Sequence, residues 1–221
     1  MNKEVRSLEF EIRAEETGQE KRAGRLTGTP IVFDQATDMG WYQEIIDKDA
    51  LIDCDLKDVR FLVGHDTTGI PLARSRNNNE NSTMQLTVTD RGMEIRVDLD
   101  IENNPRAKEL YSAVQRGDIS GMSFMFIVDR DAWDDIDTDY PKRTILGIRT
   151  VLEVSAVAFP AYPQTDIQAA SEGESLDSAR ASLESAKQRL EEERAAQAET
   201  ERRTALLERL NKITEVSDDE V

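Results

Sequence analysis

Histidine and cysteine are nearly absent from this chain of 221 residues, which contains one of each, His65 and Cys54. A single cysteine excludes an intramolecular disulfide and a cysteine-based metal cluster, and a single histidine excludes zinc sites built on two or three histidines. No apolar run approaches the roughly 18 residues of a membrane helix, and the N-terminal stretch lacks the apolar segment of a signal peptide. We therefore expect a soluble, intracellular protein with no metal and no cofactor.

Basic residues are fewer than acidic ones: the chain has 28 Lys and Arg against 45 Asp and Glu, which gives a net charge of −17. Such an excess repels phosphate backbones, which argues against nucleic acid as a direct partner. The same excess is also explained by solubility alone.

Beyond Gly173 the chain has no glycine, proline or aromatic residue. The composition there is rich in strong helix formers and predicts a long helix over residues 175–214. Apolar residues recur along it at helical spacing, beginning with Leu176, Leu183 and Leu190. We interpret residues 1–168 as one domain and residues 169–221 as an acidic helical, coiled-coil extension. That extension either is solvated or pairs with a partner, including a second copy of the chain.

The first 170 residues consist mainly of short alternating or apolar stretches, the pattern of β-strands. Two stretches instead have the pattern of helices, residues 44–53 and 104–116. The acidic segment 129–140 is aperiodic and is interpreted as an exposed loop; it lacks the ligand spacing of a calcium loop. The predicted strands cover residues 6–14, 25–33, 59–64, 84–89, 93–99, 121–128 and 143–159. The fold class expected is α+β, mainly an antiparallel β-barrel with surrounding helices, followed by the long C-terminal helix.

His65 is the one imidazole available as a general base, and it lies in FLVGHDTTG, where an apolar strand opens into a loop. A serine nucleophile needs such a base. Ser120 and Ser123 stand in GDISGMSFMF, where nearby glycines allow close backbone approach. Each of these residues also has an ordinary interpretation, as a strand-end histidine or as serines hydrogen-bonded within a sheet.

Glu153 lies in the apolar stretch TVLEVSAVAF, where a carboxylate needs a partner. That partner is either the imidazole, which it would orient, or a nearby arginine. Ser155, two residues on, shares its face and is a rival nucleophile. Cys54 is a weak candidate, because the acidic residues around it raise the pKa of a thiol.

Four segments in order resemble the prohead (capsid maturation) serine proteases of tailed phages: LTGTPIVFD, FLVGHD, GDISGMSFMF and EVSAVAFPAYPQT. The resemblance implies a fold similar to the herpesvirus assemblins and a triad in the order His, Ser, third residue. Because a second histidine is missing, the third member must be an acid. Carried over, His65 is the base, Ser123 the nucleophile and Glu153 the acid.

The resemblance also implies a serine endopeptidase that acts in the host cytoplasm, inside the immature procapsid. Its substrates would be the scaffold or the N-terminal delta region of the major capsid protein, and the protease itself. The C-terminal extension would hold the enzyme in the shell. The alternatives are a non-catalytic scaffold or assembly adaptor with a coiled-coil arm, and a cysteine hydrolase that uses Cys54.

Overall fold

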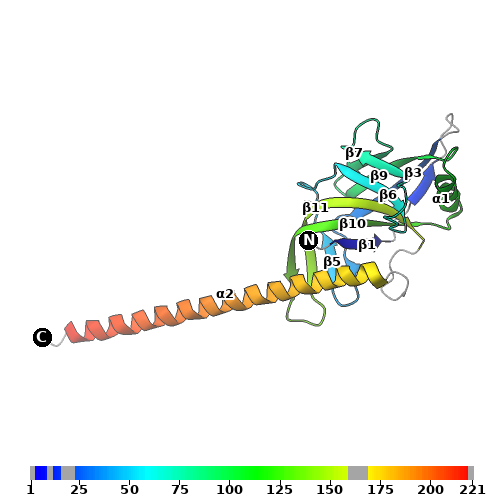
Figure 1. The fold of residues 1–221 in the computed structure, drawn as a ribbon. Coiled ribbons are helices and arrows are strands. Elements are labelled where there is room, and N and C mark those ends of the chain that lie inside the picture. The colour runs from blue at the N-terminus through cyan, green and yellow to red at the C-terminus, as the bar shows by residue number, and fades with distance from the viewer. Residues whose placement is uncertain (1–2, 9–11, 16–22, 159–168, 219–221) are drawn as a thin grey trace. The chain divides into compact units, whose positions relative to one another are not determined.

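A computed structural model describes residues 3–8, 12–15, 23–158 and 169–218, which form two β-sheets and two α-helices (Figure 1). The larger sheet has the order β1-β10-β11-β5-β4, and β6 joins it by pairing with both β11 and β7. The smaller has the order β2-β3-β9-β8. The strands of the larger sheet are β1 (Glu4–Leu8), β4 (Thr37–Asp38), β5 (Gln43–Ile46), β6 (Asp58–Val63), β7 (Ala73–Arg76), β10 (Gly121–Asp134) and β11 (Lys142–Val157). Those of the smaller sheet are β2 (Ile12–Glu15), β3 (Ala23–Val32), β8 (Met84–Val88) and β9 (Gly92–Asp100).

The sheets do not close, so the predicted barrel is wrong, although the mainly-β α+β class is confirmed. The reason lies in β11. One of its edges pairs antiparallel with β10, and its other edge is divided between β5 and β6, both parallel to it. The sheet therefore forks into two branches that end at β4 and β7 instead of curving round to meet β1.

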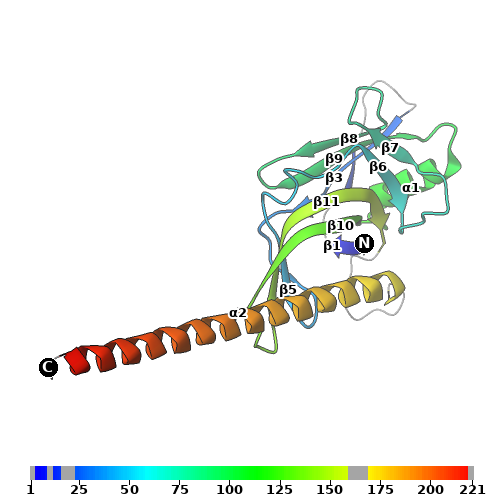
Figure 2. The same cartoon turned by 60° about the vertical axis from the view of Figure 1, so that its left-hand side comes forward.

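Alternation along β10 explains how the core is formed. Phe124 and Phe126 point to one face, are fully buried, and stack with their ring centroids 4.8 Å apart. They belong to one apolar cluster that also contains Leu26 and Met93 from the smaller sheet and Phe61 from β6. Figure 2 shows the strands that carry this core, with β10 and β11 beside β6. The opposite face of β10 is thereby left to carry polar groups such as Ser123.

Apart from the first, each predicted strand overlaps an observed one, and residue 159 of the last lies outside the described residues. Residues 6–14 were expected to form one strand, but they contribute to β1 and β2, which lie in different sheets. The loop predicted over residues 129–140 is also wrong in part, because β10 continues to Asp134. Its carboxylates are used locally: Asp131 pairs with Arg143 at 2.7 Å, and Asp135 pairs with Lys142 at 2.8 Å.

One predicted helix is confirmed and the other is wrong. Helix α1 (Pro105–Arg116) begins after Asn104, whose side chain accepts from the backbone N–H groups of the first turn, and ends at Gly117 with φ 78°. Residues 44–53 contain strand β5 and turns instead. The parallel register of β5 on β11, which no local pattern reveals, overrides their helical spacing.

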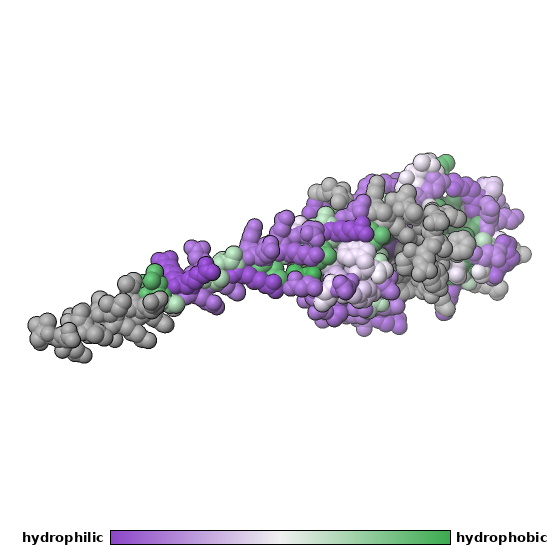
Figure 3. Space-filling view, turned by 90° about the horizontal axis from the view of Figure 1, so that it is seen from below, coloured by the Kyte–Doolittle hydropathy of each residue, from purple (hydrophilic) through white to green (hydrophobic). Residues whose placement is uncertain are grey.

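Helix α2 (Ala169–Asp218) is longer than predicted at both ends. The chain divides into two compact units, Met1–Ala179 and Arg180–Val221, so most of α2 forms a unit of its own. Its described surface is largely hydrophilic, with apolar residues such as Leu206 and Leu207 more than half exposed (Figure 3). Neither helix, over the residues that can be described, is both long and apolar enough to span a membrane.

Candidate active site

A tight turn at the end of β6 presents His65. Gly64 and His65 both have positive φ, 58° and 59°, and the Asp66 N–H donates to the carbonyl of Val63 at 3.2 Å. Two consecutive left-handed residues closed by such a bond are the features of a type I′ turn. The Gly64 N–H still donates to Ala156 O, at 3.0 Å, so the turn remains attached to β11. Histidine tolerates a left-handed backbone better than most residues but less well than glycine, so the structure holds this side chain in place against a local cost.

The structure places the imidazole of His65 against the carboxylate of Glu153. Their Nδ1 and Oε1 atoms are 2.6 Å apart, and the side chains are 13% and 3% exposed. An ionised carboxylate accepts only, so Nδ1 carries the proton and Nε2 carries the lone pair. Nε2 is buried and accepts no hydrogen bond from the described residues. An imidazole oriented by an acid on one nitrogen, with the other nitrogen basic, is the arrangement that general-base catalysis requires.

Ser155 joins this pair. Its hydroxyl donates to Glu153 Oε2 at 2.5 Å and accepts from the backbone N–H of His65 at 3.1 Å. The serine therefore fixes both the carboxylate and the turn that carries the imidazole. Its hydroxyl proton is directed at the carboxylate, so Ser155 contacts the acid and the backbone of His65.

Ser123 lies directly opposite Ser155 in the antiparallel register of β10 and β11. Residues opposite one another in such a pair project to the same face, with Cβ atoms about 4.5–5.5 Å apart. Glu153, two residues before Ser155, shares that face. Ser123 is fully buried, and its hydroxyl donates to the carbonyl of Arg6 on β1 at 2.9 Å. Ser120, by contrast, is exposed and precedes β10.

The thiol of Cys54 is poorly suited to act as a nucleophile. The residue is half-buried, and burial, with a smaller contribution from Asp55, raises the pKa of its thiol to about 12. A thiol with so high a pKa supplies almost no thiolate at neutral pH. Among the described residues, no three His, Cys, Asp or Glu side chains gather as a metal site would require.

A buried cluster of charges that was not predicted lies beside β1, formed by Glu4, Arg6, Glu44 and Arg143, all at most 3% exposed. Arg6 pairs with Glu44 through Nε and Nη2, and its Nη2 also pairs with Glu4 at 2.5 Å. Arg143 donates to Glu4 at 2.7 and 3.0 Å and to Glu44 at 3.1 Å. Burial opposes ionisation of Glu4, but its bond from Arg143 and the nearby charges outweigh this, so its pKa is lowered. The one available signal was the alternation of Glu4 and Arg6, which puts both charges on one face of a strand.

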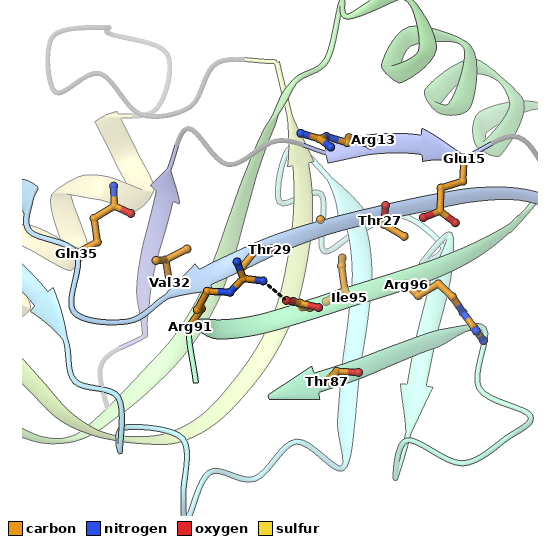
Figure 4. Close-up of a pocket in the computed structure, with 12 residues that line it drawn as sticks. Arg13, Glu15, Thr27, Thr29, Val32, Gln35, Thr87, Arg91, Ile95 and Arg96 are labelled. Carbon is orange, nitrogen blue, oxygen red and sulfur yellow. Dashed lines mark ion pairs between the residues drawn. The ribbon is translucent and has the colours of Figure 1, made fainter. Parts of the chain in front are cut away.

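A separate concavity lies on the smaller sheet (Figure 4). It has a volume of about 850 Å³, is lined by charged and hydroxyl side chains, and His65 is not among its lining residues. Arg91 and Glu94 form an ion pair across part of it at 3.7 Å. The candidate catalytic residues are therefore not in this hollow but on β6, β11 and β10.

Comparison with known proteins identifies a family for the chain. The family model described as caudovirus prohead serine protease matches residues 8–179. No curated protein and no solved structure matches the chain. The matched residues include His65, Ser123, Glu153 and Ser155.

Proposed function

Because the chain belongs to the caudovirus prohead serine proteases, we propose that it is the serine endopeptidase that cleaves the scaffold or the N-terminal delta region of the major capsid protein, and itself, inside the procapsid. One observation carries the catalytic part of the proposal: His65 Nδ1 lies 2.6 Å from a buried carboxylate while its Nε2 stays free of hydrogen bonds from the described residues. That arrangement is suited to deprotonating a serine.

In the proposed reaction, Nε2 of His65 takes the hydroxyl proton of Ser123 as the oxygen attacks a substrate carbonyl carbon. The tetrahedral intermediate collapses, Nε2 gives the proton to the departing amine, and an acyl-serine remains. A water molecule, deprotonated by the same nitrogen, then hydrolyses the ester. Glu153 keeps Nδ1 protonated and stabilises the imidazolium formed in each half.

Ser123 is assigned as nucleophile and Ser155 as the positioning residue. The Ser155 hydroxyl donates to Glu153, so its proton points to the acid and not to Nε2. The Ser123 hydroxyl lies on the same face, one strand away, and donates to a backbone carbonyl that a moving strand could vacate.

The test compares Ser120→Ala, Ser123→Ala and Ser155→Ala by intact mass after reaction with a fluorophosphonate. We expect Ser123→Ala to gain no adduct, Ser120→Ala to react like the wild type, and Ser155→Ala to react more slowly. An adduct on Ser123→Ala that is lost in Ser155→Ala would transfer the nucleophile to Ser155. Adducts at wild-type rates in all three, or a wild-type rate in His65→Asn, would refute the protease mechanism and favour an assembly adaptor.

We also propose that residues 1–168 form the catalytic domain and that residues 169–221 retain it within the assembling shell, through capsid components or a second copy of the same helix. The support is the largely hydrophilic surface of α2 with apolar residues at intervals. Such a helix gains little from burial by itself and is suited to pairing.

A further inference from the structure

Strand β1 occupies the edge of β10 at the candidate nucleophile. The two strands pair antiparallel from Glu4 opposite Phe126 to Leu8 opposite Met122, and they lie side by side in both ribbon views (Figures 1 and 2). At the centre of this pairing, the carbonyl of Arg6 accepts the hydroxyl of Ser123 at 2.9 Å. An extended segment added to a sheet edge is one of the common ways in which proteins bind peptides. Here the added segment presents a peptide carbonyl to the serine.

The contacts that hold β1 are mainly polar. Of its residues with described side chains, Glu4 and Arg6 are charged and only Val5 is apolar. On the outer edge of β1, the Val5 N–H donates to Ser175 Oγ at 2.9 Å, and Glu4 accepts from Ser178 Oγ at 3.0 Å. Buried ion pairs add little net stability compared with apolar packing, because their charges regain hydration when they separate. These bonds hold the strand in one position, and its charges would be hydrated again if it withdrew.

If β1 withdrew, the charged side chains that remain beside it would carry a net negative charge. Without β1, Glu44 loses its bonds from Arg6, and Arg143 alone faces both Glu44 and Asp131. Two carboxylates opposite one guanidinium favour a cationic side chain at the place that Arg6 occupies. Residues 4–7 also precede the stretch that matches the family, so the edge is filled by a segment outside the shared region.

We propose that this edge of β10 is the substrate-binding strand, that a substrate segment with Arg or Lys at the Arg6 position pairs there, and that β1 is a built-in competitor that must withdraw first. This proposal rests on the protease function proposed above. It extends that function by naming where the substrate chain lies and which side chain it carries.

The first experiment loosens β1 without altering the candidate catalytic residues. Ser175→Ala/Ser178→Ala removes the two hydroxyls that hold its outer edge, and alanine is a better helix former than serine. We expect the full-length variant to react with a fluorophosphonate at Ser123 faster than the wild type, because the hydroxyl is freed more often. A rate that is unchanged or lower would overturn the proposal.

The second experiment locks β1 in place. Val5 and Met125 are partners in the register, and opposite antiparallel residues have Cα separations of about 4.5 or 5.5 Å, within the range a disulfide spans. In Val5→Cys/Met125→Cys, made with Cys54→Ala, we expect the labelling rate to fall in proportion to the fraction of oxidised chains and to return on reduction. Equal rates in the oxidised and reduced forms would overturn the proposal. A reduced form and a wild type that both fail to react would instead refute the protease function.

A third measurement tests the side chain. The acetylated peptide KEVRSL, which copies residues 3–8, is added to the loosened variant, and its Arg6→Gln version serves as the matched control. We expect the arginine peptide to slow the labelling of Ser123 at lower concentration than the glutamine peptide. Equal protection by the two peptides would refute the preference for a basic residue.

Discussion

Replacing Glu153 by glutamine separates a catalytic acid from a structural ion pair. The carboxylate accepts two short hydrogen bonds, from His65 Nδ1 at 2.6 Å and from Ser155 Oγ at 2.5 Å. Hydrogen bonds to a charged group contribute about 1.5–3 kcal/mol each and neutral ones about 0.5–1.5. Exchanging two of the first kind for two of the second costs about 2–3 kcal/mol, and removing a buried charge offsets part of this. Domains have about 5–15 kcal/mol of stability, so the variant should stay folded.

The effect on the reaction should be far larger than the effect on folding. The amide bears no charge to stabilise the imidazolium, and it can turn its NH2 toward Nδ1, which moves the ring proton to Nε2. In a serine protease triad the matching change lowers kcat about 10⁴-fold, a barrier increase of about 5.5 kcal/mol at 1.36 kcal/mol per factor of ten. We therefore expect Glu153→Gln to lose about four orders of magnitude in fluorophosphonate labelling rate, with a change in unfolding free energy of about 3 kcal/mol or less.

The assay follows labelling by intact mass and stability by urea unfolding on the same preparation. Ser155→Ala is the matched control, because it removes one bond to the same carboxylate and leaves the charge. Labelling of Glu153→Gln within a few-fold of the wild-type rate, in protein shown to be folded, would refute the role of the acid. The pair would then be structural only.

Four further outcomes follow from the same contacts. Glu44→Ala should lower the unfolding free energy by about 3–5 kcal/mol, since it removes a buried carboxylate that accepts from both Arg6 and Arg143; urea unfolding measures this, and a loss below about 1 kcal/mol would contradict it. Cys54→Ala should label at the wild-type rate, whereas a large loss would revive a cysteine nucleophile. Gly92→Ala should destabilise the chain by more than about 1 kcal/mol, because φ is 154° and a Cβ would overlap the carbonyl oxygen of Ile31; an unchanged thermal midpoint would disprove this. Deleting residues 180–221 should leave labelling unchanged but reduce incorporation into procapsids, and normal incorporation would refute retention by the tail.

The contact between His65 and Glu153 was predictable from sequence because His65 is the one histidine of the chain and Glu153 is a carboxylate within an apolar stretch. One imidazole in the chain and one carboxylate in an apolar strand leave few pairings that satisfy both. The role of Ser155 in holding the acid was not foreseen, because strand alternation shows a shared face but not the direction of a hydroxyl proton. Helix α1 was predictable for a similar local reason, since Asn104 and Gly117 mark its ends.

The features that were not predicted depend on which strands pair with one another. Glu44 was assigned to a helix because its neighbours have helical spacing, and only the parallel pairing with β11 makes it a strand residue. Arg6 was treated as the start of one strand over residues 6–14, and Glu4 was left outside it, whereas the structure has β1 and β2 there in different sheets. The barrel failed for a related reason, because a strand with three neighbours cannot be recognised from its own pattern. Buried charges that satisfy one another across three strands cannot be paired from the sequence of any one strand.

In the turn that carries His65, the backbone conformation and the proposed chemistry favour different residue types. With φ of 59°, position 65 favours glycine or asparagine, and the reaction proposed here needs an imidazole. A library selected only for thermal stability should therefore measure which contributes more to folding at position 65, the backbone preference for Gly and Asn or the bond from the imidazole to Glu153. The same library selected for fluorophosphonate labelling should keep histidine alone at position 65, because the proposed reaction needs an imidazole.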